Sequence, residues 1–210
     1  MDPSAGKAKY DVKKEERELY APGRSFTLVE VPPQRFLAVD GHGNPNTSPE
    51  YSDAVQALYA VAYSLKFTAK RSLGQDSVVA PLEGLWRAEN PDVFVQGNKD
   101  SWDWTMLIRQ PEWITPKMAT AAAMDVRAKK NLDAAAGIRW LALHEGLSVQ
   151  LLHIGSYDDE APVLARLHHE FMPANQLEFN GDHHEIYLSD PRRTAPEKLR
   201  TILRQPVRRK

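Results

Sequence analysis

Hydrophobic and polar residues repeat with two different periods along this chain, and these periods predict its elements. Residues 26–30 and 35–40 alternate as strands do, and the glycine- and proline-containing segment 41–45 then interrupts the pattern. Ser48 is placed to cap a helix that starts with Pro49, a residue favoured at the first helical position. The apolar residues behind that start fall at helical spacing: Val55, Leu58, Tyr59, Ala62 and Leu65.

The pattern then returns to strand spacing before a second helix. Residues 77–86 and 102–109 read as two strands joined by the polar connection 89–100. Thr115 and Pro116 repeat the chemistry of a helix start, so an alanine-rich helix is predicted through about Lys130. Its alanine content favours close packing against a neighbouring helix.

The second half of the chain repeats this plan. Strands are predicted over 138–143 and 148–154, a helix over 159–171, a strand over 177–188 and a short terminal helix over 196–203. The halves, about 25–111 and 138–207, thus share the order strand, glycine, helix, strand, with the 115–130 helix between them, although residue identity between the halves is too low to prove a duplication. We expect an α+β domain built from duplicated βαββ units, with pseudo-two-fold symmetry, helices on one side and a central ligand cleft. Residues 1–24 are expected to be a loosely held lead-in, parts of which can pack, and no function is assigned to them.

Composition narrows the possible functions. The 210 residues contain no cysteine, which excludes disulfides, thiolate metal sites and thiol nucleophiles. The net charge of −1, from 27 basic and 28 acidic residues, argues against a nucleic-acid partner. The basic residues near the C-terminus are expected to be a solvated end: Arg204, Arg208, Arg209 and Lys210. No secretory signal or membrane-spanning run is present, so we expect a cytoplasmic protein without a membrane partner.

The segment from His183 to Leu188 carries the most informative chemistry. If it is a strand, Glu185 and Tyr187 project from one face and Ile186 and Leu188 from the other. A carboxylate beside a phenol suits a binding or reaction pocket if that face is concave and partly dry. The alternative is a solvated strand face on which Glu185 has no role.

Five tryptophans lie on or near predicted strands, and three of them fall within 102–113. Alternation places Trp102, Trp104, Met106 and Ile108 on one face of their strand. Such a face is ordinarily core, but indole rings at this density also line ligand sites, where they stack on flat molecules. The tryptophans in question are Trp86, Trp102, Trp104, Trp113 and Trp140.

Two further residues are candidates for the same pocket. Glu83, between apolar neighbours in a predicted strand, either faces water or is buried with a partner. Gly155 permits a sharp turn that directs Tyr157 back across the sheet. The paired histidines 168–169 and 183–184 point apart, and no metal-binding spacing appears, so neither a metal nor another cofactor is predicted.

Five segments together resemble the GyrI-like small-molecule-binding family, from about Phe26 to Val207. The most specific are Glu185 to Pro191 and Pro196 to Arg204; the others are Pro81 to Trp86, Asp103 to Pro111 and His153 to Tyr157. The resemblance implies a duplicated strand-helix-strand-strand fold with a cleft between its halves. Members include ligand-sensing domains of transcription activators, a gyrase-inhibitory protein, and stand-alone enzymes that hydrolyse the cyclopropane of DNA-alkylating natural products. Without a recognisable DNA-reading module, this chain resembles the stand-alone branch.

The resemblance implies a role for Glu185, because family members use a glutamate in the last cleft strand to meet cationic, apolar ligands. In the hydrolase branch an acidic residue is implied to act with a tyrosine inside an aromatic cleft. We therefore expect Glu185 as general base and Tyr157 as the second catalytic group, although which tyrosine faces the cleft stays open. The expected ligand-contacting residues are Tyr187, Trp86, Trp104, Trp113, Glu83, Tyr59 and Met106.

Three functions are consistent with these residues. The first is hydrolysis of a strained cyclopropane in a planar aromatic substrate. The second is binding or sequestration of aromatic, cationic compounds without chemistry, with Glu185 as a counter-charge. The third is a protein-interaction role as a gyrase modulator. In each case the chain is expected to be a monomer or a homodimer.

Overall fold

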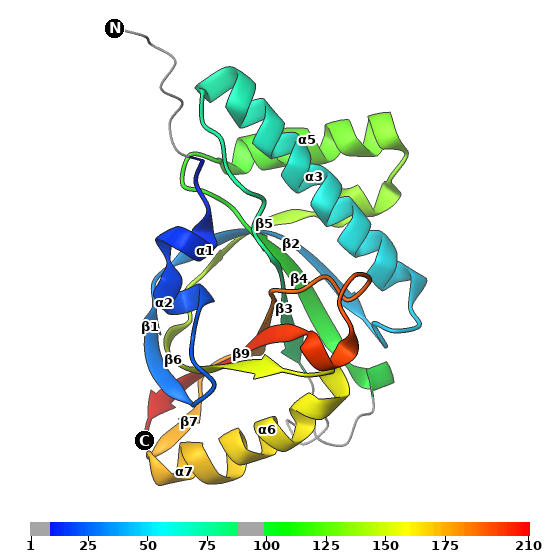
Figure 1. Ribbon diagram of the computed structural model, residues 1–210. Coiled ribbons are helices and arrows are strands. Elements are labelled where there is room, and N and C mark those ends of the chain that lie inside the picture. The colour runs from blue at the N-terminus through cyan, green and yellow to red at the C-terminus, as the bar shows by residue number, and fades with distance from the viewer. Residues whose placement is uncertain (1–8, 88–98) are drawn as a thin grey trace, which may run out of the picture.

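The computed structural model describes residues 9–87 and 99–210, which form one antiparallel sheet with helices packed on it (Figure 1). The strands of this sheet follow the order β1-β6-β9-β8-β3-β4-β2-β5, and β7 pairs with β9 outside that path. Their bounds are β1 Thr27–Val31, β2 Gln34–His42, β3 Leu82–Arg87, β4 Asp103–Arg109, β5 Arg139–Leu143, β6 Gly146–Ile154, β7 Leu177–Phe179, β8 His183–Tyr187 and β9 Arg200–Arg209.

Two long helices follow the predicted starts. In α3, Pro49–Leu73, the Ser48 hydroxyl accepts a hydrogen bond from the Tyr51 backbone N–H at 3.3 Å. In α5, Pro116–Lys130, the Thr115 hydroxyl caps the helix start in the same way. The other helical segments are short: α1 Val12–Glu15, α2 Arg17–Tyr20, α6 Ala161–Arg166, α7 Met172–Ala174, a π turn Leu167–Phe171 and the 3-10 turns Lys99–Ser101, Asp133–Gly137, Tyr157–Glu160 and Pro196–Lys198.

The strand order confirms the predicted duplication. The unit β2-α3-β3-β4 and the unit β6-α6-β8-β9 both have strand-helix-strand-strand order, and they join where β3 pairs with β8. Each unit is extended by the strand that precedes the other unit, because β1 pairs with β6 and β5 pairs with β2. The sheet is therefore continuous, with its pseudo-two-fold axis between the two central strands, β3 and β8.

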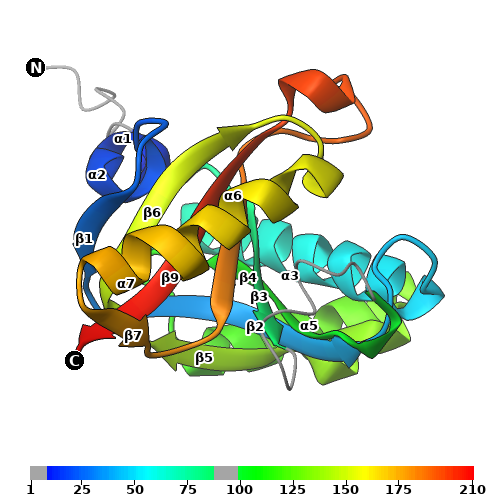
Figure 2. The ribbon, with the colours of Figure 1, turned by 90° about the horizontal axis from the view of Figure 1, so that it is seen from below.

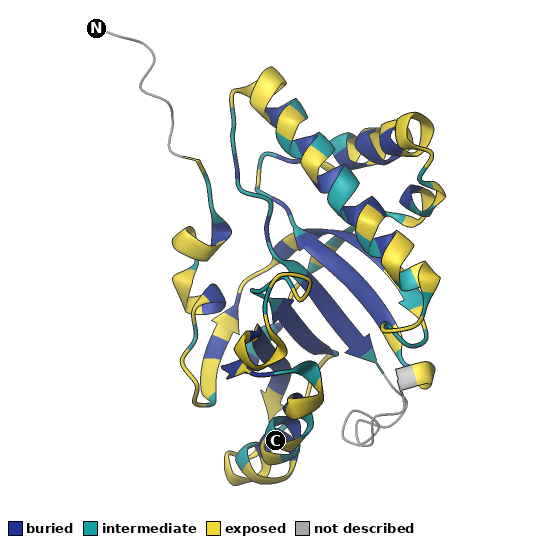
Figure 3. Ribbon diagram, turned by 45° about the vertical axis from the view of Figure 1, so that its right-hand side comes forward, coloured by how far each residue is buried: buried dark blue, intermediate teal, exposed yellow. Residues whose placement is uncertain are grey.

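The helices of both units cover the same face of the sheet, which we call the helix face. Trp86 of β3 packs against Tyr51 of α3, and Trp86 shares its strand face with Gly84, the register partner of Glu185. Leu203 of β9 also pairs with Glu185 and packs against Leu164 of α6. Figure 2 shows α6 and α7 along β6 and β9, and Figure 3 shows that the central strands are the most buried part of the chain.

The opposite face of the sheet is covered by the N-terminal segment, residues 10–24, which we call the strap. Val12, Leu19 and Tyr20 are buried, so this part of the expected lead-in packs against the sheet. Figure 1 shows α1 and α2 next to β1. Within the strap, Tyr10 also forms a parallel bridge with Ser77, so part of the predicted strand 77–86 serves to hold the strap, and β3 itself begins at Leu82.

Two sequence predictions for the C-terminal region are wrong. The segment 177–188 is two strands, because 180–182 lie outside both β7 and β8. The expected helix 196–203 is a single turn followed by the ten-residue strand β9. Leu199, Ile202 and Leu203 fit helical spacing, but Thr201, Ile202 and Leu203 pair with β6 and β8 in the middle of the sheet. Burial between two partner strands outweighed the local helix signal.

Candidate functional site

A cleft of about 1550 Å³ opens on the helix face, over the two central strands. One wall is α3, the other is the segment from Tyr157 into α6, and β3 and β8 supply the floor. The rim is completed by residues 188–192, which follow β8. Seven aromatic side chains line this cleft: Tyr51, Tyr59, Tyr63, Trp86, Trp102, Tyr157 and Tyr187.

The α3 wall follows from a spacing of four residues. Tyr51, Val55, Tyr59 and Tyr63 lie one turn apart and therefore share a helix face. Tyr59 was expected at the site, whereas Tyr51 and Tyr63 were not. The signal that could have found them is this tyrosine-rich stripe, which runs beside the apolar stripe that packs on the sheet.

Glu185 lies at the floor of the cleft and is held by its strand neighbours. Its Oε2 accepts a hydrogen bond from the Tyr187 hydroxyl at 2.8 Å, and its Oε1 lies 3.5 Å from Nε2 of His183. The Glu185 side chain keeps 12% of its surface exposed, whereas the side chain of His183 keeps 3%. The carboxylate thus faces the cleft with one strand neighbour on either side, as alternation along β8 requires.

Trp86 is the third member of this cluster, from the neighbouring strand. Its indole Nε1–H donates to the Tyr187 hydroxyl oxygen at 3.0 Å. Gly84, the register partner of Glu185, makes room for the pair, since a Cβ there would lie 2.9 Å from the indole nitrogen and 3.1 Å from the hydroxyl oxygen. The ring of Tyr157 meets that of Tyr187 edge to face at 5.7 Å.

Three tyrosines of the cleft, Tyr51, Tyr157 and Tyr187, are hydroxyl donors at neutral pH. Burial, with Glu160 and Glu185 nearby, raises the pKa of Tyr157 to about 12. Burial, together with the adjacent Glu185, likewise raises the pKa of Tyr187 and that of Tyr51 well above the usual value. A phenol that keeps its proton can donate a hydrogen bond to a substrate or to a carboxylate, but it does not act as a base.

Four expected site residues lie elsewhere. Trp104 and Met106 are completely buried on the helix face, beneath the cleft and outside its lining. Trp113 packs edge to face against Tyr10 of the strap, 5.4 Å away. Glu83 projects from the opposite face of β3, because it is one residue out of phase with Gly84 and Trp86.

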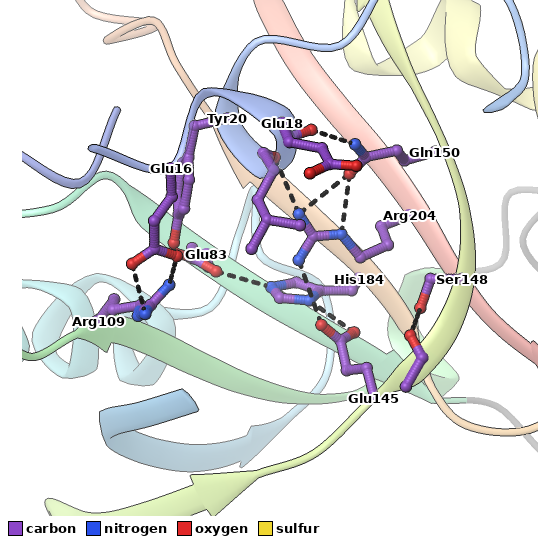
Figure 4. Close-up of polar contacts among 12 residues, drawn as sticks. Glu16, Glu18, Tyr20, Glu83, Arg109, Glu145, Ser148, Gln150, His184 and Arg204 are labelled. Carbon is purple, nitrogen blue, oxygen red and sulfur yellow. Dashed lines mark hydrogen bonds and ion pairs between the residues drawn. The ribbon is translucent and has the colours of Figure 1, made fainter. Parts of the chain in front are cut away.

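Glu83 belongs to a buried polar network under the strap, shown in Figure 4. Its carboxylate accepts a hydrogen bond from the Tyr20 hydroxyl at 2.8 Å and pairs with Nε2 of His184 at 2.9 Å. The other ring nitrogen of His184 lies 2.9 Å from Glu145. Arg204, expected in a solvated tail, is completely buried and donates to Glu145, Gln150 and the Leu19 carbonyl.

The opposite charges of this buried network balance one another. Complete burial opposes a charge on His184, yet Glu145 and Glu83 raise the pKa of His184 to about 9. Burial likewise opposes a charge on Glu145, yet His184 and Arg204 lower the pKa of Glu145 to about 2. The strap therefore covers a neutral set of paired charges, and Glu83 has a structural environment different from that of Glu185.

An open antiparallel sheet built from two βαββ units, with an aromatic cleft over their junction, is the arrangement that the resemblance implies. The sequence matches the GyrI-like small molecule binding domain over residues 24–208. This chain belongs to the GyrI-like family. The matched domain includes both walls and the floor of the cleft, and it leaves out all but the end of the strap.

Solved structures support the assignment. An uncharacterized conserved protein from Listeria innocua has a TM-score of 0.86 and 40% identity, over 95% of this chain and 100% of its own. A protein described as a hydrolase from the same organism has a TM-score of 0.84 at the same identity and coverage. The C-terminal domain of EcmrR shares the fold alone, with a TM-score of 0.57, 11% identity, and coverage of 89% of this chain and 98% of that one. Comparison with curated proteins finds no match.

Two kinds of feature are absent from the described residues. None of their helices combines the length and apolar character needed to cross a membrane. Within residues 9–87 and 99–210, no group of three or more histidine, aspartate or glutamate side chains is arranged to hold a metal ion.

Proposed function

We propose that this protein is a hydrolase that opens a strained cyclopropane ring in a planar aromatic substrate. The observation that carries the proposal is a largely buried carboxylate, Glu185, at the floor of a cleft walled by aromatic rings. In the reaction, water attacks a ring carbon, the ring C–C bond breaks, and its electron pair moves onto a conjugated carbonyl oxygen. Glu185 takes the proton from the water, and a hydroxyl stabilises the oxygen that gains charge.

Glu185 suits the role of general base because of where its oxygens lie. Oε2 is engaged by Tyr187, which holds the side chain in place, while the carboxylate remains at the surface of the cleft. A carboxylate held by hydrogen bonds in a partly dry site loses little freedom when it takes a proton from a bound water molecule. A well-placed base contributes about 10²- to 10⁴-fold to the rate.

Tyr157 is the better candidate to donate to the substrate oxygen. It lies on the cleft wall opposite α3, and burial keeps it protonated by raising its pKa to about 12. Tyr187 is less suitable, because it already accepts from Trp86 and donates to Glu185. We therefore propose that Tyr187 supports the base, and that Tyr157 stabilises the negative charge that develops on the substrate oxygen.

The aromatic walls favour a flat substrate with several rings. Trp86 and Tyr59 remain candidates for direct contact, joined by Tyr51 and Trp102, whereas Trp104 and Met106 support the floor from below. A cleft of about 1550 Å³ exceeds the roughly 300–1,000 Å³ typical of sites for drug-sized ligands. The similarity to a Listeria innocua protein described as a hydrolase, at 40% identity, also favours an enzyme.

The proposal is tested by incubating the protein with a polycyclic spirocyclopropyl-dienone in ¹⁸O-labelled water. We expect many turnovers per protein, with one labelled oxygen in the ring-opened product. Glu185→Gln should lower kcat at least 100-fold, because an amide cannot accept the proton. Glu30→Gln, at an exposed carboxylate of β1 outside the cleft, is the matched control and should leave the rate unchanged. Equal rates for Glu185→Gln and the wild-type protein would contradict the proposal.

The second candidate is binding of an aromatic, cationic compound without chemistry. The family's description as a small-molecule-binding domain favours it, and Glu185 would then supply a counter-charge. The two functions differ in stoichiometry, since a binding protein saturates at one equivalent whereas an enzyme consumes many. Quenching of tryptophan fluorescence by flat aromatic ligands, followed by product analysis, separates them.

A further inference from the structure

We propose that Trp86 is a positioning residue, whose indole N–H makes Tyr187 donate its only proton to Glu185 and so holds the proposed base in one orientation. The inference rests on the proposed function, and it assigns to Trp86 a task other than stacking on the ligand. The three side chains come from the two central strands, β3 and β8, and meet on the helix face.

The argument depends on the direction of each hydrogen bond. An indole nitrogen carries a hydrogen and has no acceptor site, so the contact of 3.0 Å between Trp86 Nε1 and the Tyr187 oxygen has only one possible direction. The Tyr187 hydroxyl has a single hydrogen. It cannot donate this hydrogen to the indole nitrogen, because that nitrogen has no acceptor site. The hydrogen is therefore available to Oε2 of Glu185, which lies 2.8 Å away. Trp86 thus determines the direction of the second hydrogen bond through the first.

This arrangement persists at neutral pH. Burial and the adjacent Glu185 raise the pKa of Tyr187 well above its usual value, so the phenol keeps the hydrogen that it donates. The indole hydrogen does not titrate in water. The two hydrogen bonds form a series in which Trp86 and Tyr187 are the donors and Glu185 is the final acceptor. Hydrogen bonds in such a series strengthen one another.

Gly84 provides the space in which the indole of Trp86 and the phenol of Tyr187 meet. A Cβ at this position would approach the indole nitrogen to 2.9 Å, the Tyr187 oxygen to 3.1 Å and the sulfur of Met106 to 3.3 Å. Any other residue at 84 would therefore force the indole or the phenol to move. The glycine lies directly opposite Glu185 in the register, so the close approach of Trp86 and Tyr187 occurs next to the carboxylate that they orient.

The test is a double-mutant cycle on turnover of the polycyclic spirocyclopropyl-dienone, with Trp86→Phe, Tyr187→Phe and the double variant. Trp86→Phe keeps an aromatic ring and removes the N–H donor. We expect each single variant to lower kcat about tenfold, and the double variant to fall no further than Tyr187→Phe alone. That non-additivity would show that Trp86 acts through Tyr187. Fully additive losses would overturn the inference, because Trp86 would then act on the substrate directly.

The matched control uses Trp102, the second indole on the cleft lining, whose ring lies edge to face with that of Trp86 at 5.3 Å. Trp102→Phe combined with Tyr187→Phe should give additive changes, which appear in KM more than in kcat. Coupling as strong as that of Trp86 would overturn the specific role of Trp86, because any indole on the wall would then suffice.

A spectroscopic measurement keeps the inference separate from the proposed function. In ¹H–¹⁵N spectra, the Trp86 indole N–H signal should move upfield in Tyr187→Phe, which removes its acceptor, and should move less in Glu185→Gln. This readout needs no turnover, so it applies even if the protein only binds its ligand. An indole signal unchanged by Tyr187→Phe would show that the hydrogen bond does not exist in solution, and the inference would fall while catalysis by Glu185 could still stand.

Discussion

Two glutamates in adjacent central strands, Glu83 and Glu185, have opposite environments. Glu185 lies at the floor of the cleft, with Tyr187 and His183 as strand neighbours. Glu83 lies on the other face of the sheet, has no exposed surface, and is paired with Tyr20 of the strap and with His184. The difference arises from the register, which aligns Glu185 with Gly84 and therefore turns Glu83 the other way.

This comparison separates two uses of a buried carboxylate. Around Glu83 every charge meets an opposite charge, and removal of one partner would leave another charge buried without compensation. Around Glu185 the neighbours hold the carboxylate but leave it in contact with the cleft. We therefore expect substitutions under the strap to lower stability, and substitutions at the cleft floor to change ligand chemistry with little effect on stability.

The largest loss of folding stability is expected when Arg204 is replaced. Replacement by leucine leaves Glu145 paired only with His184 and leaves the acceptors on Gln150 and Leu19 without a donor. Loss of one partner from a buried pair costs about 3–5 kcal/mol, which corresponds to a fall in Tm of about 10 °C for a chain of this size. Thermal unfolding followed by circular dichroism measures the change.

Arg208 supplies the matched control for this prediction, because it lies on the same strand and pairs with Glu178 at an exposed site. Arg208→Leu should alter the free energy of unfolding by no more than about 0.5 kcal/mol. Similar losses for the two variants would mean that the buried network contributes no more than a surface pair does.

A smaller loss of folding stability is expected when each of the two glutamates is replaced by glutamine. Glu83→Gln should lower the free energy of unfolding by about 2 kcal/mol, because an amide offers one acceptor oxygen where Tyr20 and His184 need two. Glu185→Gln should cost less than about 1 kcal/mol, since its amide oxygen can still accept from Tyr187. Urea unfolding of both variants measures the two losses. A larger loss for Glu185→Gln than for Glu83→Gln would contradict the prediction.

A dependence of stability on pH is also expected from the strap side. His184 has a folded pKa of about 9 against 6.5 ordinarily, so its contribution is complete below pH 6.5 and is lost as pH rises through 9. Glu145 has a folded pKa of about 2 against 4.5, so its contribution is complete above pH 4.5 and is lost as pH falls toward 2. We expect Tm to be highest between pH 4.5 and 6.5.

The control for this pH profile is His184→Gln, which removes the titrating ring. This variant should be less stable than the wild-type protein at pH 6. Its Tm should also fall less than the wild-type Tm between pH 6.5 and 9, because the ring that loses its proton is gone. A wild-type Tm that stays constant from pH 6 to 9.5 would show that His184 is not charged in the folded protein.

Much of the fold was predictable because the signals were local. Ser48 and Thr115 mark the starts of α3 and α5, and both cap their helices as predicted. Alternation correctly placed Glu185 and Tyr187 on one face of β8. The site could be predicted only in part, because the tyrosines of α3 become site residues through the packing of that helix on the sheet, and their spacing by itself does not distinguish a cleft wall from a core stripe.

The sequence by itself determined the starts of the two long helices and the residues that share a strand face, since each depends on neighbours within a few positions. The tertiary structure decided which face of the sheet each carboxylate occupies, that 200–209 is a central strand, and that the strap closes over His184 and Arg204. These outcomes depend on register and on partners up to 185 residues apart. Local periodicity carries no information about contacts at that separation, so only the folded chain reveals which of two similar glutamates faces the cleft.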